Sequence, residues 1–132
     1  MILGCGRVGS GLAANLSANH HVSVVDWNQS AFERLPTGFS GDTVLGNGID
    51  ADILRAAGVE NAALFLALTD LDNRNLMAAQ VARELGARRV VARVYEPIRA
   101  EVFQTMGVTT VCPTVNAAQK LFEMVTSGPE GA

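Results

Sequence analysis

Short apolar runs alternate along the chain with segments of helical periodicity. Several of the runs are apolar on consecutive residues, which is typical of strands covered on both faces. These runs lie at Met1–Leu3, Val22–Val25, Thr43–Leu45, Ala63–Leu68, Val90–Val94 and Thr110–Cys112. Helices are predicted between them at Val8–Ala18, Gln29–Leu35, Ala51–Ala57, Asn73–Leu85 and Pro97–Met106. This order predicts an α/β fold with a doubly wound, parallel, six-stranded sheet and helices on both faces.

Residues typical of helix ends support the predicted bounds of the helices. Gly58, Gly86 and Gly107 each follow a predicted helix, where the chain must turn left-handed. Asp50 and Asp72 are predicted to cap helix N-termini. The first strand has only three residues before a glycine-rich turn, so we expect the natural chain to begin earlier.

Composition and charge narrow the class of protein. A chain of 132 residues with 48% hydrophobic and 17% charged residues predicts one folded domain, which we place at residues 1–126, with a flexible tail at 127–132. The net charge of −3 lacks the basic excess of a nucleic-acid surface. No apolar run reaches the ~18 residues that a membrane span needs, and no signal peptide opens the chain. We therefore expect a cytoplasmic protein.

A glycine loop follows the first predicted strand and opens the first predicted helix. Its sequence is Gly4-Cys5-Gly6-Arg7-Val8-Gly9, and Asp26 ends the next strand 22 residues after Gly4. This spacing is typical of the Rossmann dinucleotide fingerprint. Gly4 permits the tight turn, Gly6 lets the backbone approach a pyrophosphate, and Gly9 lets the helix pack closely on the strand. The free amides of the first helical turn favour an anion there.

The acidic residue after the second strand also bears on the choice of cofactor. The Asp26 carboxylate can accept hydrogen bonds from both hydroxyls of an adenosine ribose, whereas a 2′-phosphate would face it with like charge. Trp27 and Asn28 follow Asp26, where an NADP site would favour an arginine. NADP is therefore disfavoured.

Catalytic groups do not fit the pattern. His20 and His21 fall in the turn before the second strand, at the amino end of the sheet, whereas ligands bind at the carboxyl ends. We interpret Cys5 as a small buried residue of the glycine loop, and its distance in sequence from Cys112 argues against a zinc site or disulfide scaffold. We predict ligand binding without catalysis; the alternative is the NAD-binding domain of an oxidoreductase that lacks its catalytic part.

Five motifs together resemble a known family, the RCK N-lobe (regulator of potassium conductance), also called the Trk-type potassium-uptake N-terminal domain. They are Gly4–Gly9, Val25–Asn28, Gly46–Gly48, Leu68–Asp70 with Asp72 and Asn75, and Val91–Val94. The resemblance extends from about Met1 to Val125. The segment Asp72-Asn73-Arg74-Asn75-Leu76-Met77-Ala78-Ala79, inside a predicted helix, is its most specific part.

The resemblance implies a cytoplasmic domain, peripheral to the membrane, that binds NAD(H) or ATP/ADP and gates a potassium channel or transporter. A second alternative is the similar regulatory domain of potassium/proton antiporters. The nucleotide contacts that we predict are Gly4, Gly6, Arg7, Val8, Gly9, Asp26, Trp27, Asn28, Asn47, Gly48, Thr69, Asn75 and Arg93.

Three of these residues leave alternatives open on sequence grounds. Arg7 projects from the anion-binding loop and is either a phosphate contact or a solvated surface arginine. Arg93 interrupts an apolar strand, so its charge needs a partner, either a ligand phosphate or an internal carboxylate. Asn75 is either a ligand contact or an amide on the helix surface.

Two features depart from the family pattern. Many relatives carry Pro-Glu after the sixth strand, where the glutamate helps to hold a metal ion at the nucleotide. This chain has Pro113-Thr114 there, so we predict no metal site. The C-lobe that usually follows is also missing, which favours an excised N-lobe over a complete natural protein.

A final helix is predicted from Thr114 to Val125. Its apolar residues recur at intervals of three and four and form one stripe, Val115, Ala118, Leu121, Phe122 and Val125. This stripe either covers the sheet of its own chain, which suits a monomer, or packs on a second copy. The resemblance implies the second arrangement, a homodimer, with a ring as a higher assembly.

Overall fold

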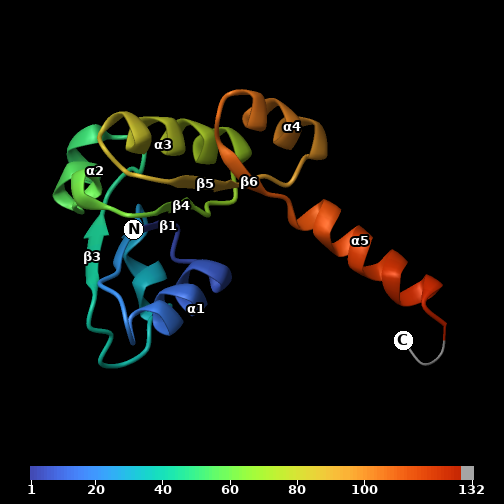
Figure 1. Ribbon diagram of the computed structural model, residues 1–132. Coiled ribbons are helices and arrows are strands. Elements are labelled where there is room, and N and C mark those ends of the chain that lie inside the picture. The colour runs from blue at the N-terminus through green and yellow to red at the C-terminus, as the bar shows by residue number, and fades with distance from the viewer. Residues whose placement is uncertain (129–132) are drawn as a thin grey trace.

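Six parallel strands form one sheet in the order β3-β2-β1-β4-β5-β6 (Figure 1). The structure is a computed structural model that describes residues 1–128. The strands are β1 (Ile2–Leu3), β2 (Ser23–Asp26), β3 (Asp42–Leu45), β4 (Phe65–Ala67), β5 (Val90–Arg93) and β6 (Thr109–Val111). The helices are α1 (Arg7–Leu16), α2 (Ala51–Ala56), α3 (Asp72–Glu84), α4 (Pro97–Thr105) and α5 (Pro113–Thr126), with 3₁₀ helices η1 (Gln29–Arg34) and η2 (Val59–Asn61).

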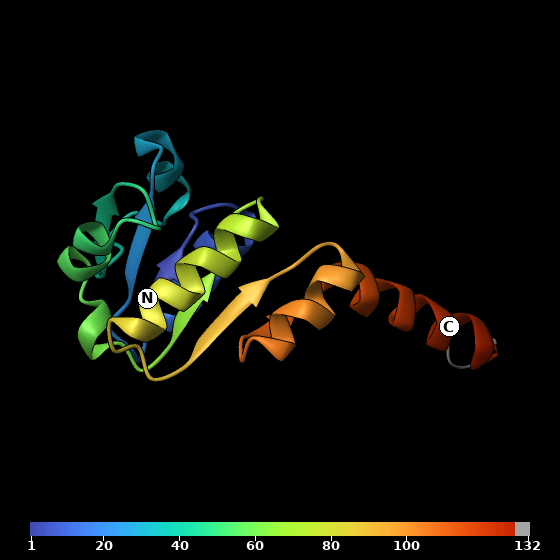
Figure 2. The same ribbon diagram turned by 90° about the horizontal axis from the view of Figure 1, so that it is seen from above.

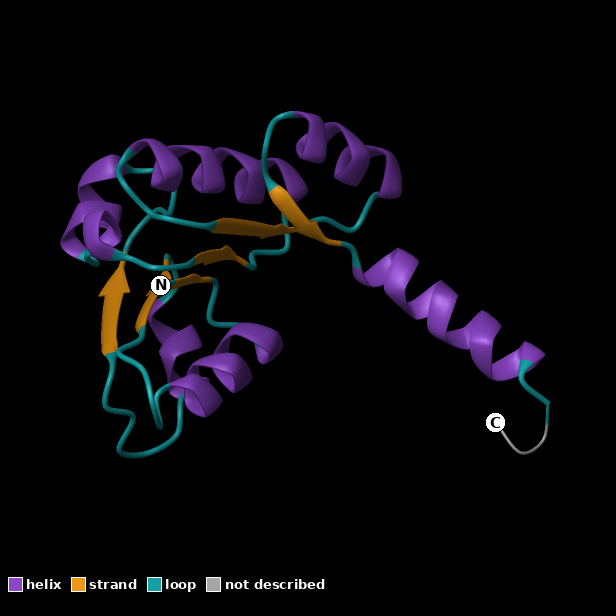
Figure 3. Cartoon of the chain, in the orientation of Figure 1, coloured by secondary structure: helices purple, strands orange, loops and turns teal. Residues whose placement is uncertain are grey.

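Helices cover both faces of this sheet, as the continuous apolar strands predict. On one face, α2, α3 and α4 pack against the sheet through buried residues such as Leu54, Ala79 and Phe103. On the other face, α1 and η1 contribute Ala13 and Ala31 to a second cluster. Figure 3 shows the strands as a layer between these helices. The predicted doubly wound parallel fold is confirmed.

The predicted helix at Gln29–Leu35 is corrected to the 3₁₀ helix η1. The Asn28 side chain caps its start by accepting a hydrogen bond from the Ser30 amide at 3.1 Å. Leu35 at its end is extended because it precedes Pro36, which disfavours helical backbone in the residue before it. Local signals thus fix both ends of this segment, and the residues between them form a 3₁₀ helix.

Most of the predictions for the helix ends are confirmed, and the one for Asp72 is wrong. Asp50 caps α2 by accepting a hydrogen bond from the Asp52 amide at 2.9 Å, and all three glycines predicted after helices have positive φ. The cap of α3, however, is Leu71, and Asp72 is the first helical residue and is buried. Its carboxylate instead reaches the turn after β5, which needs partners for its free amides.

Three hydrogen bonds hold the Asp72 carboxylate. The amides of Tyr95 and Glu96 donate to it at 2.9 and 3.2 Å, and the Arg99 guanidinium donates at 3.3 Å. These contacts join the start of α3 to the turn between β5 and α4. They hold the backbone of the residues that directly follow β5 in place.

The last helix, α5, extends away from the sheet (Figure 2). It buries none of its residues, and Phe122 and Val125 are 63% and 80% exposed. The arrangement in which the stripe covers the sheet of its own chain is therefore wrong. Of the predicted tail at 127–132, residues 129–132 lie outside the described part of the chain. None of the helices within residues 1–128 is long and apolar enough to cross a membrane.

We expect Asp72 to make the stability of the fold depend on acidic pH. Burial alone would raise the pKa of its carboxyl, but the hydrogen bonds from Tyr95, Glu96 and Arg99 outweigh burial and hold the pKa below its usual 3.8. A lowered folded-state pKa contributes stability that is present above the unfolded-state pKa and is lost as the pH falls through the folded-state value. The free energy of unfolding should therefore fall below about pH 4.

The variant Asp72→Asn isolates this contribution in urea unfolding at several pH values. It should lower the free energy of unfolding by about 1–3 kcal/mol at pH 7, because the Tyr95 and Glu96 amides and Arg99 lose a charged acceptor. The difference from the wild type should shrink toward pH 3. Asp50→Asn, which keeps a capping oxygen, is the control. A difference that stays constant across this range would contradict the assignment.

Candidate functional site

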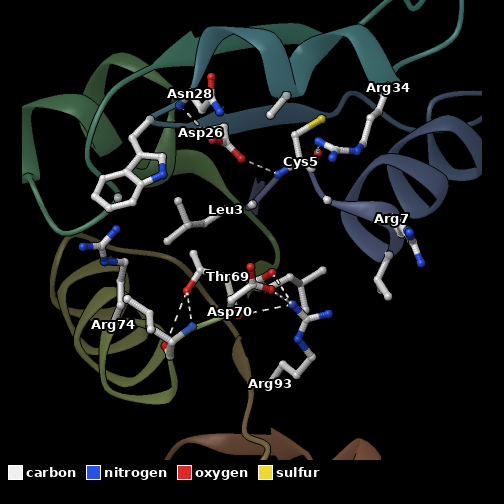
Figure 4. A pocket seen from close by; sticks show the side chains of 18 of the residues that line it. Leu3, Cys5, Arg7, Asp26, Asn28, Arg34, Thr69, Asp70, Arg74 and Arg93 are labelled. Carbon is white, nitrogen blue, oxygen red and sulfur yellow. Dashed lines mark hydrogen bonds and ion pairs between the residues drawn. The ribbon is translucent and has the colours of Figure 1, made fainter.

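A cavity of about 680 Å³ opens at the carboxyl ends of the strands. It lies where the chain order of the strands reverses, since β1 has β2 on one side and β4 on the other. Open parallel sheets bind their ligands at this reversal. Its walls come from the loops after β1, β2, β3 and β4 and from the end of β5 (Figure 4). The volume suits a small organic ligand.

The glycine loop forms one wall because two of its residues admit no side chain. Gly4 has φ +105°, and a Cβ there would lie 2.8 Å from the Leu68 carbonyl oxygen of the neighbouring strand end. A Cβ on Gly9 would overlap the Gly4 carbonyl oxygen. The tight turn and the close packing of α1 on the strand thus have the cause that the sequence predicts. Gly6 faces open space at the start of α1 and lines the cavity.

The Asp26 carboxylate is held by the backbone around it. One oxygen accepts a hydrogen bond from the Cys5 amide at 2.8 Å, and the other accepts one from the Asn28 amide at 2.9 Å. These bonds fix the carboxylate between the glycine loop and the end of β2, on the wall of the cavity. Each oxygen retains a lone pair for a further donor.

Positive charge is concentrated around this cavity. Four of the ten basic residues of the chain line it, with only two of the thirteen acidic ones. The basic residues are Arg7, Arg34, Arg74 and Arg93, and the acidic ones are Asp26 and Asp70. The whole chain carries a net charge of −3. An excess of arginine against this background favours an anionic ligand.

Arg93 reaches the cavity from β5. One of its terminal nitrogens, Nη2, donates to the carbonyl oxygens of Leu68 at 2.7 Å and Thr69 at 3.2 Å. The same nitrogen lies 3.7 Å from the Asp70 carboxylate, which is 97% exposed and therefore a weak partner. Its Nε is buried without a hydrogen-bond partner, the one such side-chain atom in the part of the chain that the structure describes. Arg93 thus binds backbone carbonyls first and keeps donor capacity free.

Asn75 lies behind the cavity wall and not in it. Its side chain is fully buried, and its Oδ1 accepts hydrogen bonds from the Thr69 amide at 2.9 Å and the Thr69 hydroxyl at 2.6 Å. Its Nδ2 donates to the carbonyls of Thr69 and Arg93, both at 2.9 Å. All four bonding positions of the amide are occupied. Asn75 therefore positions the loop after β4 against β5, and neither sequence alternative for it describes this role.

The structure brings most of the other predicted contacts together. Gly9 and Asn47 do not line the cavity: Gly9 packs under Gly4, and the Asn47 side chain accepts a hydrogen bond from the Ile49 amide at 3.2 Å. The predicted residues that line it are Gly4, Gly6, Arg7, Val8, Asp26, Trp27, Asn28, Gly48, Thr69 and Arg93.

Sequence reasoning missed several lining residues. They are Leu3, Cys5, Ala31, Arg34, Gly46, Leu68, Asp70, Leu71, Arg74 and Tyr95. Two of them, Arg34 and Arg74, change the electrostatics of the site. A signal for Arg74 was present, since it lies inside the motif segment around Asn75. Arg34 carries no comparable signal, because only the path of η1 brings it to the glycine loop.

Cys5 and the two histidines, the side chains considered above for catalysis, lie in different cavities. Cys5 is fully buried, and burial, followed by the charge of Asp26, raises the pKa of its thiol against the opposing effect of Arg34. The thiol therefore stays protonated and unreactive at neutral pH. His20 and His21 lie before β2 at the amino end of the sheet, as predicted, and they line a second cavity there. Between residues 1 and 128, no three potential metal ligands converge.

The chain is similar to potassium uptake proteins of bacteria and archaea. Residues 1–114 match the model of the TrkA-N domain family. The Trk system potassium uptake protein TrkA of Streptomyces coelicolor is 48% identical over 98% of this chain and 60% of that protein. A TrkA homolog of Archaeoglobus fulgidus is 33% identical over 95% of this chain and 30% of its own length. The chain thus spans about one third to three fifths of the length of these relatives.

Solved structures share the same architecture. The TrkA-N domain of the inner membrane protein ybaL from Escherichia coli superposes with a TM-score of 0.82 over 92% of each chain, at 21% identity, and shows the fold alone. The GsuK channel bound to NAD has a TM-score of 0.75 at 26% identity, over 93% of this chain and 22% of that one. GsuK bound to ADP has a TM-score of 0.70, also at 26% identity, over 84% and 30%.

We expect Asn75 to stabilise the fold through its buried hydrogen bonds. Asn75→Ala should lower the free energy of unfolding by about 2–3 kcal/mol, because the Thr69 amide and the Arg93 carbonyl lose their partners. Chemical denaturation measures this loss. Asn73→Ala, at an exposed position on the same helix, is the matched control and should change stability little. Equal losses in both variants would contradict this assignment.

Proposed function

The chain belongs to the TrkA-N domain family, and from this we propose that it is a nucleotide-sensing regulatory domain of a potassium transport system. It binds NAD(H) or ATP/ADP in the cavity at the sheet reversal and controls a membrane channel or transporter from the cytoplasmic side. The observation that carries the proposal is the combination, in one cavity, of a fixed Asp26 carboxylate, a glycine loop at a helix start and four arginines.

Each part of an adenine nucleotide has a partner of suitable chemistry in this cavity. The amides at the start of α1 and the side chains of Arg7 and Arg34 suit the phosphates. The Asp26 carboxylate suits the ribose hydroxyls, and its fixed orientation avoids an ordering cost on binding. A ribose 2′-phosphate would meet this carboxylate with like charge, which disfavours NADP.

The adenosine diphosphate unit is the element common to the candidate ligands. GsuK has been solved with NAD and with ADP, and both ligands contain this unit. We propose that the chain recognises the same unit, so NAD(H), ADP and ATP share one site. The relatives from Streptomyces coelicolor and Archaeoglobus fulgidus carry the names of potassium uptake proteins, which favours a regulatory role over an enzymatic one.

We also propose that the domain forms a homodimer through α5. This helix presents its apolar stripe to solvent over the 14 residues of Pro113–Thr126. An exposed apolar stripe of this length is typical of an interface. A second copy related by a two-fold axis would cover both stripes at once, since each helix then contacts the other. Higher rings would need further surfaces.

The ribose assignment predicts a loss of nucleotide affinity in Asp26→Ala. NADH and ADP should both bind more weakly by about 1–3 kcal/mol, since both present the same ribose diol to the carboxylate. Isothermal titration calorimetry measures both affinities, and circular dichroism checks the fold, because Asp26 also holds two backbone amides. Asp70→Asn, at an exposed acid on the same cavity, is the control. Equal affinities in the wild type and Asp26→Ala would refute the assignment.

The dimer proposal predicts a change of mass in Phe122→Glu. The wild type should be dimeric in light scattering at tens of micromolar, and the variant monomeric, because a charge would be buried at the interface. Asn116→Glu adds the same charge on the opposite side of α5 and should leave the dimer intact. A monomeric wild type, or a variant that stays dimeric, would end this proposal.

A further inference from the structure

An aromatic–cation pair bridges one end of the cavity. The Arg74 guanidinium carbon lies 3.9 Å from the centre of the Trp27 ring. Trp27 directly follows β2 and Arg74 belongs to the first turn of α3, and both line the cavity. The pair therefore connects the half of the sheet that holds Asp26 with the half that carries the loop after β4. We call this pair the latch.

The two halves of the latch differ in how firmly they are held. Trp27 lies between Asp26, which is hydrogen-bonded to the Cys5 and Asn28 amides, and Asn28, which caps η1. Arg74 makes no hydrogen bond and no ion pair with any residue from 1 to 128, so its guanidinium is held by the indole ring alone. The backbone that carries the indole is thus anchored on both sides, whereas no polar contact within these residues ties the guanidinium in place. Figure 4 shows Arg74 at the end of the cavity away from Arg7.

The spacing of the latch leaves no room for a third group. A distance of 3.9 Å is already a stacking contact, so a flat ligand cannot enter between the guanidinium and the indole. A base that stacks on this face of Trp27 must first displace Arg74. Stacking of a base on an aromatic ring is stronger than an exposed cation–π contact, so this exchange is favourable.

We propose that the latch is the base-sensing element of this site, and that a purine opens it by taking the place of the Arg74 guanidinium on the Trp27 ring. The inference rests on the proposed nucleotide site, in which Asp26 holds the ribose and thereby places the base beside the adjacent Trp27. Phosphate groups alone bind at the other end of the cavity and leave the latch closed. Occupancy by a purine nucleotide thereby frees the Arg74 guanidinium from the Trp27 ring.

The single tryptophan of the chain makes the latch directly observable. The probes are ADP, which carries the base, and inorganic pyrophosphate, which does not. ADP should change the intrinsic fluorescence of Trp27, and pyrophosphate should leave it unchanged. Calorimetry then gives both affinities, and their ratio isolates the contribution of the base from the attraction of the arginines for phosphate.

Substitutions at the two residues of the latch should move this ratio in opposite directions. Trp27→Ala should lower the preference for ADP over pyrophosphate by about tenfold or more, because the stacking surface is lost, and Trp27→Phe should restore part of it. Arg74→Ala should raise the preference by about two- to fivefold, because the base no longer competes with the guanidinium. Both side chains line the cavity, so we expect the variants to fold, and circular dichroism checks this.

The outcomes separate the latch from the nucleotide site itself. ADP that binds by calorimetry without changing the fluorescence of Trp27 would overturn the latch and leave the proposed function standing. A fall of the ratio in Arg74→Ala would also overturn it, since Arg74 would then contact the base. If neither ADP, ATP nor NADH binds the wild-type chain, the proposed function fails, and the latch fails with it.

Discussion

The geometry of the site depends on one buried side chain, the amide of Asn75. Its four hydrogen bonds join the loop after β4 to the end of β5 from within α3, and they leave no polar atom of the amide unsatisfied. A buried network of this kind permits a single arrangement, because any shift would expose donors and acceptors without partners. The carbonyls that Arg93 binds lie on the same loop, so the position of its charge follows from this arrangement.

In the other half of the sheet, a carboxylate joins the loops at the strand ends. Asp26 joins the glycine loop to the residues after β2, much as Asn75 joins β4 to β5. The strand order reverses at β1, and this leaves a gap between the loops after β1 and β4. Asp26 holds one wall of the gap in place, and Asn75 holds the other. The carboxylate is the brace on the wall proposed for the ribose, and the arginines gather around the rest of the cavity. Rigid walls with fixed charges reduce the cost of ordering a ligand.

The spacing of residues close in sequence was enough to predict the fold and part of the site. The residues that were missed or misassigned depend on contacts between distant parts of the chain. The glycine loop, Asp26 and the alternation of strands and helices are written in short stretches of sequence, and the fold and family that they predicted are confirmed. Asp72 satisfies amides that follow another strand, and nothing near it in sequence distinguishes this role from a cap. Arg34 lies at the end of η1 and reaches the cavity through the tertiary path of that segment, which no local motif announces.

Because α5 extends outward from the sheet, a small rotation at its first residues displaces its far end by a larger distance. The helix begins at Pro113, and the adjacent Thr114 hydroxyl donates to the carbonyl of the cavity residue Tyr95 at 2.7 Å. A helix of 14 residues is about 21 Å long, so a rotation of about 5° at its base displaces its far end by about 2 Å. A rotation of this size about the Thr114–Tyr95 contact would therefore move the tip of α5 by more than a bond length.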